Sequence, residues 1–267
     1  MKSIIYVVSE NIKNLYRILS ISKYELLSDM RDSKLGIVWN ILNPLIQVST
    51  YWFVFGIGIR GGEPVGGVEF LDWMLAGLLV WFFIRPCITK GVNAISSKIN
   101  VITKMKFPIS ILPATVVLKE LFNHCFMLVI VYLLFLIRGM APSIYNLQVF
   151  YYTMCIVALS ISISMITSSL NVFTKDVRKM VNASMRILMY LTPILWTMDK
   201  LPISIKMVMK CNPIFYIVEG YRDCFFYHKS ILAAPREMAI FWITVAVLFV
   251  IGSNLIYKFK HKFIDLL

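Results

Sequence analysis

The feature that most constrains this fold is an uncharged stretch that runs from Leu35 to Ile59 without one Asp, Glu, Lys or Arg. A helix of this length can cross a bilayer core, which is about 30 Å thick. Similar apolar stretches recur along the chain, some with an isolated cation or proline. We therefore predict an all-α integral membrane protein with one six-helix transmembrane domain over residues 37–257, and with spans near residues 37–59, 71–94, 109–137, 147–172, 178–198 and 238–257.

The fifth of these spans is the least regular, because only residues 187–198 are apolar and Pro193 lies among them. A proline-rich outer segment at residues 199–237 follows it. The apolar part of this segment, residues 213–218, is too short to cross a membrane. We expect the outer segment to form short re-entrant helices that dip into the outer leaflet.

Residues 1–36 are expected to form a cytosolic N-terminus with an amphipathic interface helix. On a helical wheel one narrow face is apolar and the opposite side is charged, the pattern of a helix that lies in the membrane surface. The alternative is a juxtamembrane cytosolic helix without a partner. The apolar face holds Ile12, Leu15, Leu19, Leu26 and Met30, and the charged side holds Lys13, Arg17, Glu25, Arg31 and Asp32.

The lysines and arginines indicate on which side of the membrane each loop lies. They gather in the N-terminus, in residues 93–107 and 171–186 and in the tail at residues 258–267, whereas loops 60–70 and 138–146 carry one each. By the positive-inside rule, both termini of this multi-pass protein are cytosolic. Because scattered inner loops account for the net charge of +13, we expect no nucleic-acid partner.

The sequence lacks the common catalytic motifs. No glycine is followed by lysine, so there is no phosphate-binding P-loop, and neither GxSxG nor HExxH occurs. The cysteines form no CxxC pair and the histidines are isolated. We therefore predict no catalytic residue, no metal site and no cofactor in this chain, so that energy for any uphill transport must come from another subunit.

Aromatic residues cluster in several spans, and they have two possible roles. Trp and Tyr are common in interfacial belts and in helix packing. Aromatic rings also stack on sugars, so they could instead line a path along which a polysaccharide slides. The candidates for such a path are Tyr51, Trp52, Phe55, Trp73, Trp81, Phe82, Tyr190 and Trp196.

Arg85 is an unusual residue because it lies within the second span. Its long side chain could snorkel to the inner headgroups. It could also face a polar path and meet an anionic substrate, as ionisable residues inside a membrane often do. Both interpretations remain open at the level of sequence, and Arg85 joins the candidate path.

Four motifs together resemble one protein family. LGIVWNILNPLIQ, after a basic amphipathic segment, resembles the LGxxWxxxxP motif of polysaccharide-exporting ABC-2 permeases, and KINVITKMKFPISILP resembles their cytosolic segment between spans two and three. FTKDVRKM resembles their loop after span four, with Lys175 where arginine is usual, and CNPIFYIVEGYRDCFFYH resembles their NPxxxxxxxxR outer segment. The motifs follow the family's order over essentially the whole chain. YWFVFGIGIRG and the GYR…YH ending are most similar to the teichoic acid translocation permeases of Gram-positive bacteria.

This resemblance implies a fold, partners and a substrate. The fold is an ABC-2 or type V exporter-like transmembrane domain. It would form a homodimer that binds two nucleotide-binding ATPase subunits, with ATP and Mg²⁺ on those subunits. The complex would export an undecaprenyl-diphosphate-linked teichoic acid across a bacterial plasma membrane, and the alternative substrate is O-antigen or capsular polysaccharide.

The family pattern also implies roles for individual residues. The interface helix would gate or receive the lipid head, through Arg31, Lys34 and Trp39. Two basic loops would dock on the ATPases, through Lys98, Lys104, Lys106, Lys175, Asp176 and Arg178.

Two other classes of function fit the residues less well. A membrane enzyme acting on polyprenyl-phosphate sugars would need paired acids, and Glu63, Glu69, Asp72 and Asp199 form no recognisable pair. A passive scaffold would not need the proline-rich outer segment.

Overall fold

The computed structural model describes residues 2–31, 36, 38–99, 107–199 and 201–260, and its named elements within these ranges are all helices. This confirms the predicted all-α class. The longer elements are α1 (Lys2–Lys13), α2 (Leu15–Arg31), α3 (Val38–Tyr51), α4 (Phe70–Gly91), α6 (Leu112–Ile137), α7 (Val149–Asn171), α8 (Asp176–Leu191), α9 (Ile203–Lys210), α10 (Pro213–Arg222) and α11 (Pro235–Phe259). Short 3₁₀ or π-helical segments are η1 (Trp52–Ile59), η2 (Ser96–Lys98), η3 (Ile109–Ile111), η4 (Ile144–Gln148), η5 (Asp223–Tyr227) and η6 (Ile231–Ala233).

Among the described residues, 5 helices are long and apolar enough to cross a membrane. Their bounds lie within a few residues of five of the expected spans. The exception is the fifth expected span, where α8 is a helix of 16 residues that carries Asp176, Arg178, Lys179 and Arg186. The five helices are Val38–Ile59, Phe70–Gly91, Ile109–Ile137, Ile144–Asn171 and Pro235–Phe259.

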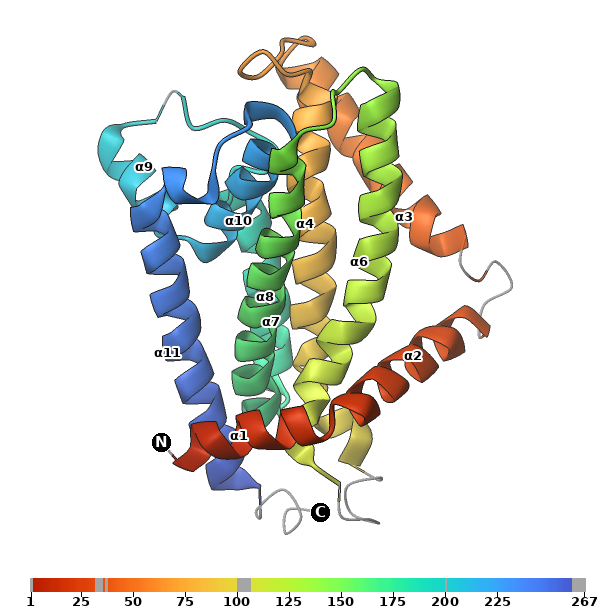
Figure 1. The fold of residues 1–267 in the computed structure, drawn as a ribbon, viewed down its shortest axis with the longest axis vertical. Coiled ribbons are helices and arrows are strands. Elements are labelled where there is room, and N and C mark those ends of the chain that lie inside the picture. Colours follow the sequence, from red (N-terminus) through yellow and green to blue (C-terminus); the bar gives the residue numbers. More distant parts are fainter. Residues whose placement is uncertain (1, 32–35, 37, 100–106, 200, 261–267) are drawn as a thin grey trace.

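The long helices stand side by side in a bundle (Figure 1). α1 and α2 lie across the lower end of this bundle in Figure 1, where α11 also ends, whereas α9 and α10 lie toward the upper end. α3 leans outward from α4 and α6 at its lower end. In the most apolar 18 residues of each span, 6% are buried in Val38–Ile59, which includes α3, compared with 67% in Phe70–Gly91, which is α4. α4 is therefore a central helix and α3 a peripheral one.

The small residues of α7 allow its neighbours to approach closely, as expected from its many serines. A Cβ on Gly91 of α4 would lie 2.2 Å from the Ser164 hydroxyl, and a Cβ on Gly252 of α11 would lie 2.8 Å from the Met165 Cβ. Contacts of this kind are how helices associate in lipid, where no hydrophobic driving force holds them together. The serines of α7 are thus packing residues.

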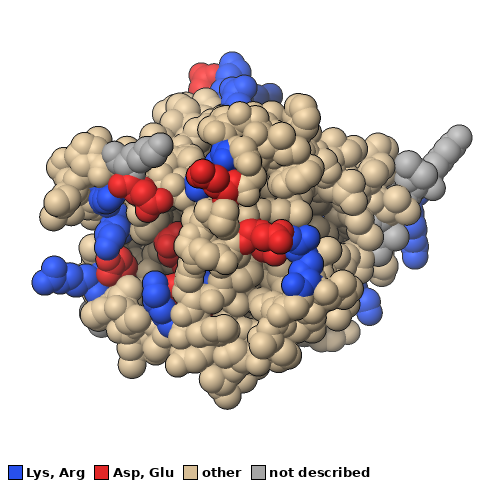
Figure 2. All heavy atoms as spheres, turned by 90° about the horizontal axis from the view of Figure 1, so that it is seen from above, with Lys and Arg blue, Asp and Glu red and all other residues tan. Residues whose placement is uncertain are grey.

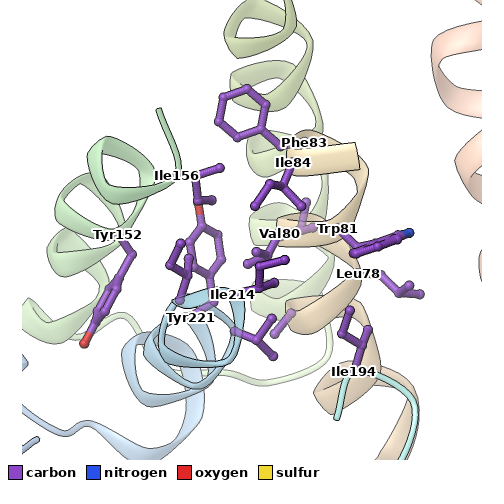
Figure 3. Close-up of a cluster of buried hydrophobic side chains, with 14 of the residues drawn as sticks. Leu78, Val80, Trp81, Phe83, Ile84, Tyr152, Ile156, Ile194, Ile214 and Tyr221 are labelled. Carbon is purple, nitrogen blue, oxygen red and sulfur yellow. The ribbon is translucent and has the colours of Figure 1, made fainter. Parts of the chain in front are cut away.

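The core lies where α4, α7 and α10 meet. Figure 3 shows Val80 and Ile84 of α4 near Ile156 of α7 and Tyr221 of α10, and all four belong to one buried hydrophobic cluster. A buried hydrogen-bond chain crosses this core, in which Tyr221 Oη lies 2.8 Å from His124 Nε2 and 2.7 Å from Thr153 Oγ1. The buried polar groups are thereby satisfied, as low-dielectric surroundings require.

The N-terminal helices are fixed to the base of the bundle by polar contacts. Ser3 bonds to Asn254 of α11, and Glu10 accepts a hydrogen bond from the Ser110 hydroxyl. On α2, the buried Ser22 donates to the Thr115 carbonyl oxygen at 2.8 Å. By contrast with Ser22, the side chains of Ile12, Leu15 and Leu19, which belong to the predicted apolar face, are exposed on the surface of this chain.

Charged residues of the upper end occur in groups of opposite sign, on a surface that is mostly uncharged (Figure 2). Arg138 pairs with Glu69 and Asp72, and Lys229 pairs with Asp223. Hydrogen bonding to Asp72 and the charges of both acids raise the pKa of the Arg138 guanidinium. The Arg138 pairs connect the end of α6 to the start of α4, whereas the Lys229–Asp223 pair is local to η5.

Candidate functional site

A basic vestibule opens at the lower end between α2, α4, α6 and α8. We use this name for a cavity of about 900 Å³ that Thr89, Lys90 and Glu120 separate from a second cavity further up. α2 contributes acids to its wall, α4 and α8 contribute cations, and α6 contributes both. Its lining includes Tyr24, Glu25, Asp29, Asn93, Lys98, Lys119 and Arg178.

Three lysines of the vestibule are paired with carboxylates. Lys98 lies 2.6 Å from Glu25, and Lys119 lies 2.6 Å from Asp29, so that two acids on α2 reach cations on the bundle. Between α4 and α6, Lys90 contacts Glu120 at 2.7 Å. Glu120 is almost fully buried, and this pairing explains how a carboxylate is tolerated there. The pairs also hold α2 against the bundle.

The second cavity, which we call the amide cleft, has a volume of about 380 Å³ and lies between α3, α4 and α6. Small-ligand pockets commonly measure about 300–1,000 Å³. Four side-chain amides line it, together with aromatic rings and cations. The lining includes Asn40, Asn43, Gln47 and Asn123, the aromatic residues Trp39 and Phe82, and Arg85, Thr89, Lys90, Glu120 and His124.

The spacing of the α3 residues explains why one face of this helix is polar. From position 40 the stripe continues three and four residues on, at 43 and 44, and then at 47 and 51, so these positions share one face of a helix. The stripe faces the bundle, because Asn40, Asn43, Pro44 and Gln47 all line the cleft. Asn40 also donates to the Asn123 Oδ1 of α6 at 3.2 Å. Sequence reasoning missed this stripe, although its spacing is visible in the sequence.

The stripe continues upward to a small group of expected path residues. The Tyr51 hydroxyl lies 3.6 Å from the Met189 sulfur of α8. Trp196 donates to the Tyr190 carbonyl oxygen at 2.8 Å. The structure therefore brings Tyr51 of α3 to the end of α8, where Tyr190 and Trp196 lie.

The remaining path candidates differ in burial. Trp73 and Trp81 are buried in the core, 4% and 1% exposed, because α4 is enclosed by other helices on that side. Both side chains pack in the core of the single chain, and their role in lining a path stays a prediction. Trp52 is exposed, and Phe55 is half-buried against the core.

The gate and coupling candidates are only partly within the described residues. Arg31 is exposed at the end of α2, and Trp39 lines the amide cleft. Lys98 and Arg178 line the vestibule, whereas Lys175 and Asp176 are exposed where α7 turns into α8. Lys34, Lys104 and Lys106 lie outside the described residues.

The NPxxxxxxxxR segment has a structural role that the sequence did not reveal. Asn212 begins α10 by accepting from the Ile214 amide at 3.0 Å, and it also donates to Thr192. The guanidinium of Arg222 is fully buried and lies 3.3 Å from the centre of the Trp73 ring. It donates to the carbonyl oxygens of Pro193 and Ile194 at 3.0 and 3.1 Å, and to Glu219 at 2.6 Å. Arg222 thus fixes the segment after α8 to α4 and α10.

Among the described residues, no group of His, Cys, Asp and Glu is arranged to hold a metal ion. The free cysteines there are Cys87, Cys125, Cys155, Cys211 and Cys224. The two adjacent cavities, with cations and amides along membrane-crossing helices, are therefore the candidate site. Their chemistry suits binding and passage of a polar or anionic molecule.

A sequence model of the family described as ABC-2 type transporter matches residues 16–226. The chain belongs to this family. Permease subunits of ABC-2 type transporters are transmembrane components that work with an ATPase subunit and are not ATPases themselves.

Three relatives of the ABC-2 permease are O-antigen export system permease proteins. Two are from Klebsiella pneumoniae, and each is 27% identical, over 89% of both chains. One is from Myxococcus xanthus and is 26% identical, over 88% of this chain and 90% of the relative. These names agree with polysaccharide export and with the alternative substrate class expected from the sequence, rather than with teichoic acid.

Proposed function

We propose that this ABC-2 permease exports a lipid-linked polysaccharide of the O-antigen class, powered by ATP hydrolysis on a separate subunit. The observation that carries the proposal is the family match over residues 16–226, together with O-antigen export relatives that align with nearly the full chain. The neighbouring vestibule and cleft add polar surface along α4 and α6, which a route for a hydrophilic polymer requires. O-antigen therefore replaces teichoic acid as the first choice of substrate.

In the proposed topology the chain crosses the membrane six times, with the lower end of Figure 1 in the cytosol. α7 ends near the lower end and α11 begins near the upper end, so α8 and the residues after it return the chain upward. A helix of 16 residues is about 24 Å long, which is close to a bilayer core. Lys175, Arg178 and Lys179 at the lower end of α8 fit a cytosolic side. The outer segment then holds α9 and α10 within the outer leaflet.

The proposed complex is a homodimer with two ATPase subunits. α3 is the least buried of the membrane-crossing helices, so its outward face is free to contact a second copy. The exposed turn with Lys175 and Asp176 is available to an ATPase, as is the region that includes Lys98. ATP-driven movement of such loops can pass to the bundle as rigid-body motion.

α1 and α2 are proposed to lie in the inner membrane interface. The exposed side chains of Ile12, Leu15 and Leu19 support this, because an interfacial helix places its apolar face in lipid. α2 would gate the vestibule, with Arg31 and Trp39 near the lipid head. In this arrangement the path continues from the vestibule past Phe82 and Arg85 to Tyr51, Tyr190 and Trp196.

Depletion of the protein in its native bacterium tests the proposal. A lipid-linked glycan should accumulate on the inner leaflet, and mass spectrometry of the extracted lipid gives its repeat unit. A repeat made of sugars is expected, whereas a polyol-phosphate repeat would make teichoic acid the substrate. Normal surface polymer and no accumulated precursor would contradict a role in export.

A further inference from the structure

Two amides of the cleft have unmet hydrogen-bonding capacity at membrane depth. Asn43 and Gln47 lie within the span Val38–Ile59, where Asn43 is exposed and Gln47 half-buried in the single chain, and neither forms a hydrogen bond to any described residue. A polar group costs free energy in an apolar environment unless it finds a partner. Water, a second protein chain or a ligand must therefore satisfy these two side chains.

The position of the amides favours a ligand inside this chain over a partner chain. Asn43 and Gln47 belong to the α3 stripe that faces α4 and α6, together with Asn40. The opposite side of α3 presents Leu45 and Ile46, which are the residues placed to meet lipid or a second copy. The amides thus point into a cavity of about 380 Å³ that a single chain already encloses on three sides.

The chemistry of the cleft matches a sugar ring. A side-chain amide both donates and accepts, as sugar hydroxyl groups do, and four amides converge here. Trp39 and Phe82 offer aromatic faces, which suit the apolar side of a sugar ring. A purely ionic ligand would not need the amides, and an acyl chain would need neither them nor the cations.

The cations of the cleft indicate a phosphate next to that sugar. Arg85 lines the cleft and forms no ion pair with any described carboxylate, whereas Lys90 is engaged by Glu120. An arginine is well suited to charge-assisted, bidentate bonds with phosphate oxygens. The cleft also shares Thr89, Lys90 and Glu120 with the vestibule, so the two cavities are neighbours across one wall that the Lys90–Glu120 ion pair helps to form.

We propose that the amide cleft binds the sugar that is joined to the lipid diphosphate, with Asn43 and Gln47 on its hydroxyl groups and Arg85 on the adjacent phosphate. This inference rests on the proposed function and deepens it. It places the first sugar of the polymer between α3, α4 and α6 while the lipid remains outside the bundle. The permease would then recognise the start of its polymer by a sugar and not only by charge.

The test uses the permease–ATPase complex in nanodiscs and two probes, polyprenyl diphosphate with and without one N-acetylhexosamine. Affinities are measured by competition with a fluorescent polyprenyl diphosphate. The sugar-bearing probe should bind about tenfold more tightly, which corresponds to a few neutral hydrogen bonds. The double variant Asn43→Leu/Gln47→Met should remove this preference and leave the affinity for bare polyprenyl diphosphate unchanged, which also shows that the variant is folded.

Two further variants separate the parts of the proposal. Thr50 lies on α3 but does not line the cleft, so the control variant Thr50→Val should leave the affinities for both probes unchanged. Arg85→Gln should weaken both probes by a similar factor of about ten, because both carry the diphosphate. An unchanged affinity for both probes in Arg85→Gln would overturn the placement of the phosphate.

Equal binding of the two probes by the unchanged complex, or a sugar preference that survives in the double variant, would overturn the inference and leave the export function intact. Failure of the export function would show differently, as the absence of a lipid-linked precursor after depletion. If the double variant does not assemble, a photoreactive group on the sugar of the probe gives a second measurement. It should label the peptide around Asn43 in the unchanged protein, and labelling only elsewhere would also overturn the inference.

Discussion

Two arginines of this bundle occupy opposite environments. Arg222 is completely buried, and its guanidinium is satisfied by two backbone carbonyl oxygens, a carboxylate and an aromatic ring. Arg85 is exposed beside the amide cleft and has no carboxylate partner among the described residues. Arg85 lies among apolar and aromatic residues, whereas Arg222 lies between Glu219 and Asp223 in the sequence, and the surroundings of each guanidinium differ accordingly.

This difference separates a structural cation from a functional one. A buried charge is stable only if its surroundings supply hydrogen bonds and opposite charge, and the carbonyl oxygens of Pro193 and Ile194 do so for Arg222. A cation at membrane depth without such partners needs water, lipid phosphate or a ligand. The surroundings of Arg222 are complete within one chain, and those of Arg85 are not.

The largest expected effect is a loss of stability in Arg222→Met. The substitution leaves Glu219 and two buried carbonyl oxygens without their donor, a change that typically costs about 3–5 kcal/mol. Thermal unfolding of the purified protein in detergent should show a clearly lower midpoint. The matched control, Arg85→Met, should change the free energy of unfolding by about 0.5 kcal/mol or less. Equal destabilisation by both variants would refute the distinction between the two sites.

A second variant tests how tightly the region around Arg222 is packed. A Cβ on Gly220 would lie 2.1 Å from the Tyr152 ring, so Gly220→Ala requires α10 or Tyr152 to move. Overpacking of this kind costs about 1–3 kcal/mol. Gly58→Ala is the control, because its Cβ would meet only the Phe53 carbonyl oxygen, at 3.6 Å. Comparable unfolding midpoints for these two variants would indicate that the α10 region is looser than the structure describes.

The sequence predicts most of the bundle because membrane-crossing helices can be identified from the length and apolarity of a segment. Five of the expected spans have counterparts at nearly the expected bounds. α8 has a weaker signal, since Arg178, Lys179 and Arg186 interrupt its apolar residues. α8 packs against α4 and α7, and the composition of a segment does not predict which helices it will contact.

The candidate site is much less predictable from the sequence. Trp81 is in the core and Phe82 lines the cleft, although adjacent residues differ only by about 100° of rotation around the helix. Which side is buried depends on where α7 and α10 pack, and one sequence does not specify this. The α3 stripe could have been predicted from the spacing of Asn40, Asn43 and Gln47. A search for uncharged, apolar stretches does not identify it, because amides carry no charge.

The third prediction concerns function rather than stability. Arg85→Gln leaves a shorter, polar side chain without charge, so it should reduce polymer-stimulated ATP hydrolysis of the complex about tenfold, by the loss of one charge-assisted contact of about 1.4 kcal/mol. The unfolding midpoint of the variant should match that of the unchanged protein. Unaltered stimulation in Arg85→Gln would place this arginine with the residues that snorkel to lipid.

The smallest expected effect comes from the ion pairs that hold α2 to the bundle, and it completes the comparison with Arg222. Lys98 and Glu25 are partly exposed, 40% and 19%, so solvent screens their attraction. A double-mutant cycle with Lys98→Met and Glu25→Gln should give a coupling free energy of about 0.5 kcal/mol that falls at high salt. The same cycle on Arg222 and Glu219 should give a larger value with little salt dependence, because Arg222 is inaccessible to solvent. If the Lys98–Glu25 coupling proved as large and as insensitive to salt, α2 would be a fixed part of the core, and it could not move aside to admit a lipid head to the vestibule.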